Sequence, residues 1–232
     1  MSGFSRCAAQ SRPTLAMQIL LPPSEGKNEP TRRKALTWGL LSFHKELTAA
    51  RTTALKKHAE VDYSHCDVAA NVYSGVLYQA LDYQSLGAAA QTRANKSIII
   101  ISAAFGALRL TDVIPFYKFK IDPSIWKKPL ALALSGIDDQ LVVDCRSSTY
   151  STVWTPNPLN TVGIRVFQKV NGQLKVITHM SKLTRGEVTR YLVSQSKTPR
   201  TPRELHQLLN KDFNCRLVAP EGKKSWFIDV IV

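Results

Sequence analysis

The sequence predicts a single α/β domain in which a mixed central β-sheet is flanked by helices. Short apolar runs typical of buried strands alternate with longer amphipathic stretches typical of helices, which is the pattern of an α/β fold. An Asn-Gly pair between two apolar runs predicts a β-hairpin, so an entirely parallel sheet is not expected. The 232 residues and the 44% hydrophobic content are those of a globular protein with a proper core. Strands are expected at Met17, Ile98, Leu141, Gly163, Gln173 and Trp226.

Two strands and two helices are expected in the first half of the chain. Met17–Leu21 and Ile98–Ile101 are apolar runs too short to span a membrane, and the second contains only β-branched residues, which favour strands. Residues 48–58 have the apolar spacing of an amphipathic helix, with Arg51 on its wetter side. Residues 84–96 are expected to form a helix with a basic end that leads into the second strand.

The second half of the chain contains the hairpin. Residues 116–120 alternate aromatic residues with lysines, which predicts a short strand suited either to nucleic acid or to an edge protected against aggregation. Leu141–Val143 is expected to be a short strand. Asn171-Gly172 separates residues 163–169 from residues 173–178 and predicts a tight turn between two strands. The chain is completed by a basic loop at residues 194–203, a helix that begins near Thr201 and a closing strand at Trp226–Val232.

The charge balance indicates an anionic partner. The chain has 31 Lys and Arg against 17 Asp and Glu, which gives a formal net charge of +14. Residues 165–224 alone contain 13 Lys and Arg against 4 Asp and Glu, so most of the surplus lies in the C-terminal quarter. This uneven distribution favours binding of a polyanion over the alternative, a basic surface that serves solubility.

The cysteines and the N-terminal segment restrict the class of protein. The cysteines are widely separated, with no CxxC pair and no histidine at ligand spacing, so neither a zinc site nor a disulfide framework is predicted. We therefore expect a cytoplasmic protein with no metal, no cofactor and no membrane partner. Residues 1–16 lack a continuous apolar stretch and are expected to be a disordered extension, followed by one domain at residues 17–232. The four cysteines are Cys7, Cys66, Cys145 and Cys215.

Several candidate binding residues follow the ends of expected strands, where α/β sheets place their ligands. Lys27 follows the first strand, and Arg109 is the first charged residue after the second. Arg146, Ser147 and Tyr150 follow the third. A solvated loop lysine is the alternative for Lys27, and Ser147 has no general base beside it, so a nucleophilic serine is not expected.

Two further groups point to an anionic ligand. Gly75 allows close backbone approach before an apolar helix, so a phosphate could rest against this turn with the Tyr73 hydroxyl as a partner. The alternative for Tyr73 is a packed core aromatic. Lys182, Arg185 and Arg190 lie within about three helical turns of one another and favour an anion, the alternative being a solvated basic face.

These motifs resemble a known family. The run Phe105–Arg109 (FGALR), followed by Asp112, Ile114 and Tyr117, resembles the signature of the YaaA family of peroxide-stress proteins, although Leu110 stands where that family usually has proline. Further matches occur in the family's order: Pro23 and Lys27 after the first strand, Tyr73 to Gly75, Ser147 and Tyr150, the pair Arg146 and Trp154 typical of its shorter branch, and a Lys-x-x-Arg-Gly element at Lys182–Gly186.

The resemblance implies a cytoplasmic protein that binds double-stranded DNA through a basic cleft and limits oxidative damage linked to free intracellular iron. Residues 36–59 contain no Gly-x-Gly hairpin, so the helix-hairpin-helix of longer relatives is not carried over. A binding protein is expected more than an enzyme, and no catalytic residue is identified. The alternative is an enzyme that acts on a nucleotide or nucleobase in a basic pocket. The residues expected to contact DNA or phosphate are Lys27, Tyr73, Gly75, Arg109, Arg146, Ser147, Tyr150, Lys182, Arg185 and Arg190.

Overall fold

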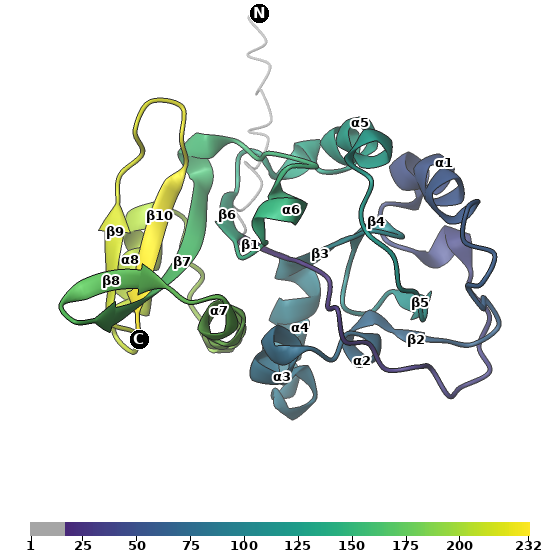
Figure 1. Ribbon diagram of the computed structural model, residues 1–232, viewed down its shortest axis with the longest axis horizontal. Coiled ribbons are helices and arrows are strands. Elements are labelled where there is room, and N and C mark those ends of the chain that lie inside the picture. The colour runs from purple at the N-terminus through teal and green to yellow at the C-terminus, as the bar shows by residue number, and fades with distance from the viewer. Residues whose placement is uncertain (1–16) are drawn as a thin grey trace, which may run out of the picture.

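A mixed β-sheet organises the computed structural model, which describes residues 17–232 (Figure 1). Its strands are β1 (Met17–Leu21), β3 (Ile98–Ser102), β4 (Gly106–Leu108), β6 (Leu141–Asp144), β7 (Thr161–Val170), β8 (Gln173–Val176), β9 (Cys215–Val218) and β10 (Trp226–Ile231). They follow the order β4-β3-β1-β6-β7-β10-β9, and β8 pairs with β7. The predicted mixed α/β fold is therefore confirmed, whereas the expectation for residues 1–16 lies outside the described residues.

The parallel strands create a switch point at β1. Ile19 pairs with Ile98 of β3 on one side and with Val143 of β6 on the other, both in parallel register. The chain thus places later strands on both sides of the first one. Ligands in open α/β sheets bind at such a point, beyond the carboxyl ends of the strands.

Helices cover both sides of the strands. They are α1 (His44–Leu55), α2 (Ala69–Val72), α3 (Val76–Leu81), α4 (Ala88–Ser97), α5 (Pro123–Ala133), α6 (Ser148–Ser151), α7 (Thr178–Ser194) and α8 (Pro202–Leu209). Helices α1 and α5 pack together beside β4, whereas α3, α4 and α7 pack together on the other side of β1 and β3 (Figure 1). The close α3–α7 contact needs a glycine, because a Cβ added at Gly186 would overlap the main-chain oxygen of Leu77.

The hairpin prediction is confirmed. Strands β7 and β8 are antiparallel and pair Val170 with Gln173 around the turn. Asn171 and Gly172 adopt φ values of 50° and 79°, the left-handed conformation that the tight turn requires. The expected C-terminal helix also forms as α8, because the Thr201 side chain accepts a hydrogen bond from the main-chain nitrogen of Glu204 and caps the helix start.

Two expectations are wrong. Residues 116–120 form no strand, and the neighbouring strand is instead β5 (Val113–Pro115), which pairs with β2 (Cys66–Val68) in a small separate sheet. The helix expected at residues 48–58 is present as α1, but Arg51 is fully buried in it.

None of the helices in residues 17–232 combines the length and apolar character needed to span a bilayer. Within the same residues, no group of three His, Cys, Asp or Glu side chains could hold a metal ion.

Candidate functional site

The loop that follows β1 is fastened to the turn before α3. Lys27 and Tyr73 form an isolated antiparallel bridge, and the main-chain nitrogen of Ser74 donates to the oxygen of Gly26 at 3.2 Å. The Gly75 nitrogen donates to Oγ of Ser24 at 2.6 Å. A Cβ added at Gly75 would collide with that Oγ, so a larger residue would displace the Ser24 hydroxyl and break this hydrogen bond.

Lys27 projects from this loop into a half-buried, aromatic environment. Its Nζ donates to the main-chain oxygen of Ser24 at 2.6 Å and lies 4.5 Å from the centre of the Tyr117 ring. Burial lowers the pKa of Lys27 to about 8, Glu25 opposes this shift, and Lys118 adds to it. The amine is therefore mostly charged at pH 7, with a neutral fraction far larger than that of an ordinary lysine.

A chain of buried hydroxyl groups lies behind Lys27. The Tyr73 hydroxyl hydrogen-bonds to the Tyr117 hydroxyl at 2.7 Å, which in turn hydrogen-bonds to Oγ of Ser102 at 2.8 Å. Ser102, the last residue of β3, also accepts from the main-chain nitrogens of Ala104 and Phe105. Burial raises the pKa of both tyrosines well above the usual range, so they act as neutral hydroxyls.

Glu25 connects Lys27 to elements far along the chain. Its carboxylate lies 3.7 Å from Nζ of Lys182 in α7. The pKa of Tyr150 in α6 is raised, mainly by burial and further by Glu25. We call this group the Lys27 cluster: Ser24, Glu25, Lys27, Tyr73, Ser102, Tyr117, Tyr150 and Lys182. Three segments that are distant in sequence, the β1 loop, α6 and the first turns of α7, therefore meet at the switch point.

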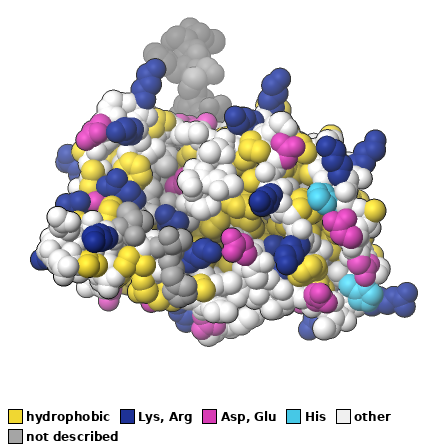
Figure 2. Space-filling model, in the orientation of Figure 1, with side chains coloured by type: hydrophobic (Ala, Val, Ile, Leu, Met, Phe, Trp, Pro, Cys, Tyr) yellow, Lys and Arg dark blue, Asp and Glu magenta, His cyan; other side chains and the backbone are white. Residues whose placement is uncertain are grey.

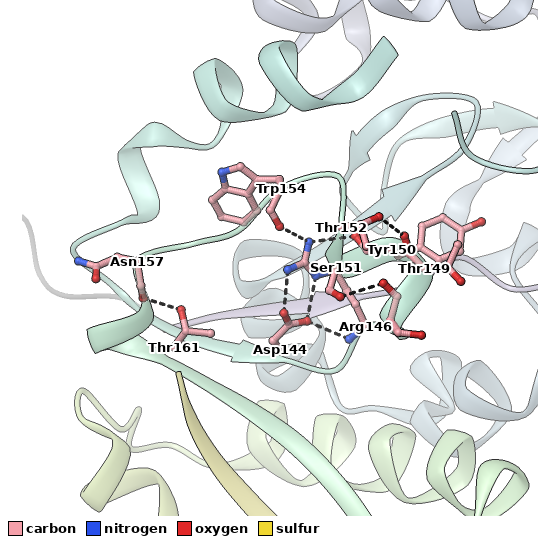
Figure 3. Close-up of polar contacts among 10 residues, drawn as sticks. Asp144, Arg146, Thr149, Tyr150, Ser151, Thr152, Trp154, Asn157 and Thr161 are labelled. Atoms are coloured by element: carbon pink, nitrogen blue, oxygen red, sulfur yellow. Dashed lines mark hydrogen bonds and ion pairs between the residues drawn. The ribbon is translucent and has the colours of Figure 1, made fainter. Parts of the chain in front are cut away.

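Arg146 supports α6 from inside the protein (Figure 3). Its guanidinium forms two hydrogen bonds with the Asp144 carboxylate, at 2.9 and 2.7 Å, and donates to the main-chain oxygens of Tyr150 and Trp154. The residue is only 5% exposed. Ser147 is the residue that precedes α6, and its main-chain oxygen accepts from Tyr150. Arg146 thus orders the segment that carries Tyr150, and its donors are occupied by protein groups.

The other predicted arginines also donate to protein groups. In α7, Arg185 donates to the main-chain oxygen of Ile164, and Arg190 donates to the oxygens of Leu81 and Asp82 at the end of α3. These contacts fix α7 against β7 and α3, which positions Lys182 beside Glu25. In this structure both arginines therefore contribute to the cluster through the scaffold.

Arg109 lies near the start of strands β1 and β3, away from the Lys27 cluster. Its Nη1 donates to Oε1 of Gln18 and to the main-chain oxygens of Lys96 and Ile98, all at 2.9–3.0 Å. Gln18 is the second residue of β1 and Ile98 is the first of β3, whereas Lys27 follows the opposite end of β1. A compact ligand held by Lys27 is therefore out of reach of Arg109.

A separate groove is lined by cations in the C-terminal part of the chain. It has a volume of about 490 Å³ and lies between the segment before α8 and the outer side of that helix. Lys197, Arg200 and Lys211 are exposed there, against one carboxylate, Glu204. We call this the basic groove, lined by Lys197, Thr198, Pro199, Arg200, Glu204, Gln207, Leu208 and Lys211.

Sequence reasoning found four members of the Lys27 cluster and missed the others. Lys27, Tyr73, Tyr150 and Lys182 were expected, and the structure brings them together around Glu25. Tyr117 belonged to the recognised motif but carried no predicted contact with Lys27. Ser24, Glu25 and Ser102 each lie at or just after a strand end, and that position was the available signal.

Comparisons with known proteins agree with the motif analysis. A family model described as "Peroxide stress protein YaaA" matches residues 17–216. A UPF0246 protein of Streptomyces coelicolor is 32% identical, with 93% of this chain and 98% of that protein covered. A UPF0246 protein of Corynebacterium glutamicum is 30% identical, with 82% and 90% covered. An uncharacterized protein of Campylobacter jejuni is 29% identical, with 73% and 82% covered.

Proposed function

The chain belongs to the peroxide stress protein YaaA family, and on that premise we propose that it binds double-stranded DNA in the cytoplasm as part of the response to peroxide. Membership of the family supports the role in peroxide stress. The DNA contact is assigned to the basic groove. In this proposal the protein occupies DNA and thereby limits the oxidative damage that is linked to free intracellular iron. Any effect on iron itself is indirect.

The observation that carries this proposal is the exposed positive charge of the C-terminal part. Lys197, Arg200 and Lys211 line one groove and form no ion pair with any residue that the structure describes. Lysine and arginine that contact phosphates release counterions from DNA, which gives strong binding without sequence preference. Arg146, Arg185 and Arg190, which donate to main-chain oxygens of the protein, are less suited to this role than these exposed side chains.

The test is a binding titration with matched charge removal. A labelled duplex of about 20 base pairs is titrated with the wild-type chain and with Lys197→Ala/Arg200→Ala/Lys211→Ala. The control, Lys45→Ala/Lys56→Ala/Lys57→Ala, removes three exposed cations from the region of α1, at the other end of the molecule from α8 (Figure 1). We expect the groove variant to bind much more weakly and the control to bind nearly as the wild type. Equal weakening by both variants would contradict the assignment to the groove.

A second candidate function is supported by the Lys27 cluster. A half-buried lysine and a second lysine, Lys182, lie at the carboxyl ends of parallel strands, where α/β proteins bind nucleotides and other phosphorylated molecules. Neutral hydroxyl donors, Tyr73 and Tyr117, stand beside them. We propose on this basis that the cluster binds a nucleotide or another phosphorylated metabolite, with or without a subsequent reaction.

Thermal unfolding in the presence of nucleotides tests this candidate. A ligand that binds only the folded chain raises its unfolding temperature in a saturable way. Lys182→Ala should abolish the shift, whereas Lys211→Ala, which removes a lysine from the basic groove, should leave it unchanged. A shift that survives Lys182→Ala, or the absence of any shift across the nucleotides tested, would reject binding at this cluster.

A further inference from the structure

One face of the sheet formed by β7, β10 and β9 carries arginines and aromatic rings instead of a helix layer. Ile164, Ile228 and Val230 point to the face that is buried with Leu205 and Leu209 of α8. Because side chains alternate along a strand, the opposite face carries the residues between them. We call it the arginine face, which consists of Gly163, Arg165 and Phe167 of β7, Phe227, Asp229 and Ile231 of β10, and Arg216 and Val218 of β9.

At the centre of this face a guanidinium lies over an aromatic ring and is bound to a carboxylate. The Cζ atom of Arg165 lies 4.3 Å from the centre of the Phe227 ring and 5.6 Å from that of Phe167. Its Nε donates to Oδ1 of Asp229 at 2.6 Å. The Phe227 ring is itself seated on Gly163, because a Cβ there would lie 2.9 Å from two ring carbons. The guanidinium is therefore in contact with an aromatic ring and with a carboxylate at once.

A second arginine shares the same carboxylate. Arg216 donates from Nε to Oδ2 of Asp229 at 3.0 Å, and its Nη2 lies 3.0 Å from the same oxygen as an ion pair. Asp229 is fully buried, whereas the side chains of Arg165 and Arg216 are 38% and 59% exposed. The single carboxylate neutralises only one of the two guanidinium groups. The arrangement therefore keeps two planar cations at the surface with a net positive charge.

The surroundings of the arginine face are also cationic. Lys169 follows on the same face of β7, and Lys223 and Lys224 are exposed in the loop that leads into β10, where Lys224 pairs with Glu221 at 3.2 Å. Figure 2 shows Lys and Arg side chains intermixed with hydrophobic ones over the region where Figure 1 draws β7, β9 and β10. Rings and guanidinium planes offer stacking surfaces to bases, and the surrounding ammonium groups offer contacts to phosphates.

We propose that the arginine face binds single-stranded nucleic acid, with an unpaired base stacked on the exposed side of the Arg165 guanidinium. A duplex buries the faces of its bases, so only a single strand can use this stack. Arg216 and the surrounding lysines contact the phosphates of the strand. This face is opposite the side of the sheet that α8 covers, so the inference does not depend on duplex binding at the basic groove.

Charge-conserving substitutions separate stacking from simple attraction. In Arg165→Lys the positive charge stays while the planar guanidinium is lost. We expect fluorescence anisotropy to show single-stranded oligothymidylate binding roughly tenfold more weakly to this variant, since one stacked base contributes a factor of that order. The control is Arg203→Lys, the same exchange at an exposed arginine of α8, and it should bind as the wild type does. Thermal unfolding of each variant shows whether the fold is retained.

An abasic strand of the same length provides a second readout on the unaltered chain. It retains the phosphates and lacks the bases, so the wild type should bind it about tenfold more weakly than oligothymidylate. Equal affinity for the two strands, or equal affinity of Arg165→Lys and wild type for oligothymidylate, would overturn the proposal. Single-strand binding without duplex binding would support it and reject the basic groove as a DNA site.

Discussion

The Lys27 amine should lose its proton at a lower pH than an ordinary lysine, with a midpoint at about pH 8, which is testable without knowing a ligand. Burial against Tyr117 lowers its pKa to about 8. At pH 7 about 9% of the amine is then neutral, against roughly 0.04% for a lysine with the ordinary pKa of about 10.4. Only the neutral amine attacks acylating reagents. The structure therefore predicts about 200-fold more reactive amine at Lys27 than in an unstructured peptide at this pH.

Pulse acetylation over a pH series measures this property at a single site. The rate at Lys27, read from the mass of its peptide, should rise with a midpoint at about pH 8. Partial burial slows the reaction at all pH values and leaves the midpoint unchanged. Glu25 raises the pKa of Lys27, so Glu25→Gln should lower the midpoint further. A midpoint close to that of an added lysine peptide, above about pH 10, would refute the account of this site.

Two predictions concern stability, measured by urea unfolding. Gly186→Ala should reduce the free energy of unfolding by about 1–3 kcal/mol, because its Cβ overlaps Leu77 where α3 meets α7. The control is Gly136→Ala, at a site with open space. Equal stability of the two variants would contradict the packing of α3 against α7. Tyr117→Phe should cost about 1–3 kcal/mol by leaving the buried Tyr73 hydroxyl without this partner, and an unchanged stability would argue against the hydroxyl chain.

The sequence identified the strands whose residues carry a strong local signal. Ile98–Ile101 is a fully buried strand because its four β-branched residues have no other favourable environment. Strand β4 was missed, because Gly106–Leu108 has no such pattern and gains its structure from pairing with β3. Residues 116–120 gave the opposite error. Tyr117 is buried and Lys118 is exposed, as the alternation indicated, but alternation does not reveal whether a neighbouring strand is present to pair.

The arginines explain why the candidate site was predicted only in part. Arg51 was expected in water, yet it is fully buried and donates to the main-chain oxygens of Ser42, Phe105 and Ala107. Arg146 is likewise engaged with its own loop. A positive side chain in a motif can either bind a ligand or satisfy main-chain carbonyls, and the second choice depends on segments that are distant in sequence. Local patterns located Lys27 and Lys182 because strand ends and helix starts position them directly.

The salt dependence of duplex binding tests the central claim most directly. If the cations of the basic groove contact phosphates, the logarithm of the wild-type binding constant should fall steeply with the logarithm of salt concentration between roughly 50 and 200 mM. The slope should become shallower by about one for each groove cation replaced by alanine. A wild-type chain that fails to bind duplex at the lower salt concentration, or a slope that Lys197→Ala/Arg200→Ala/Lys211→Ala leaves unchanged, would contradict the account.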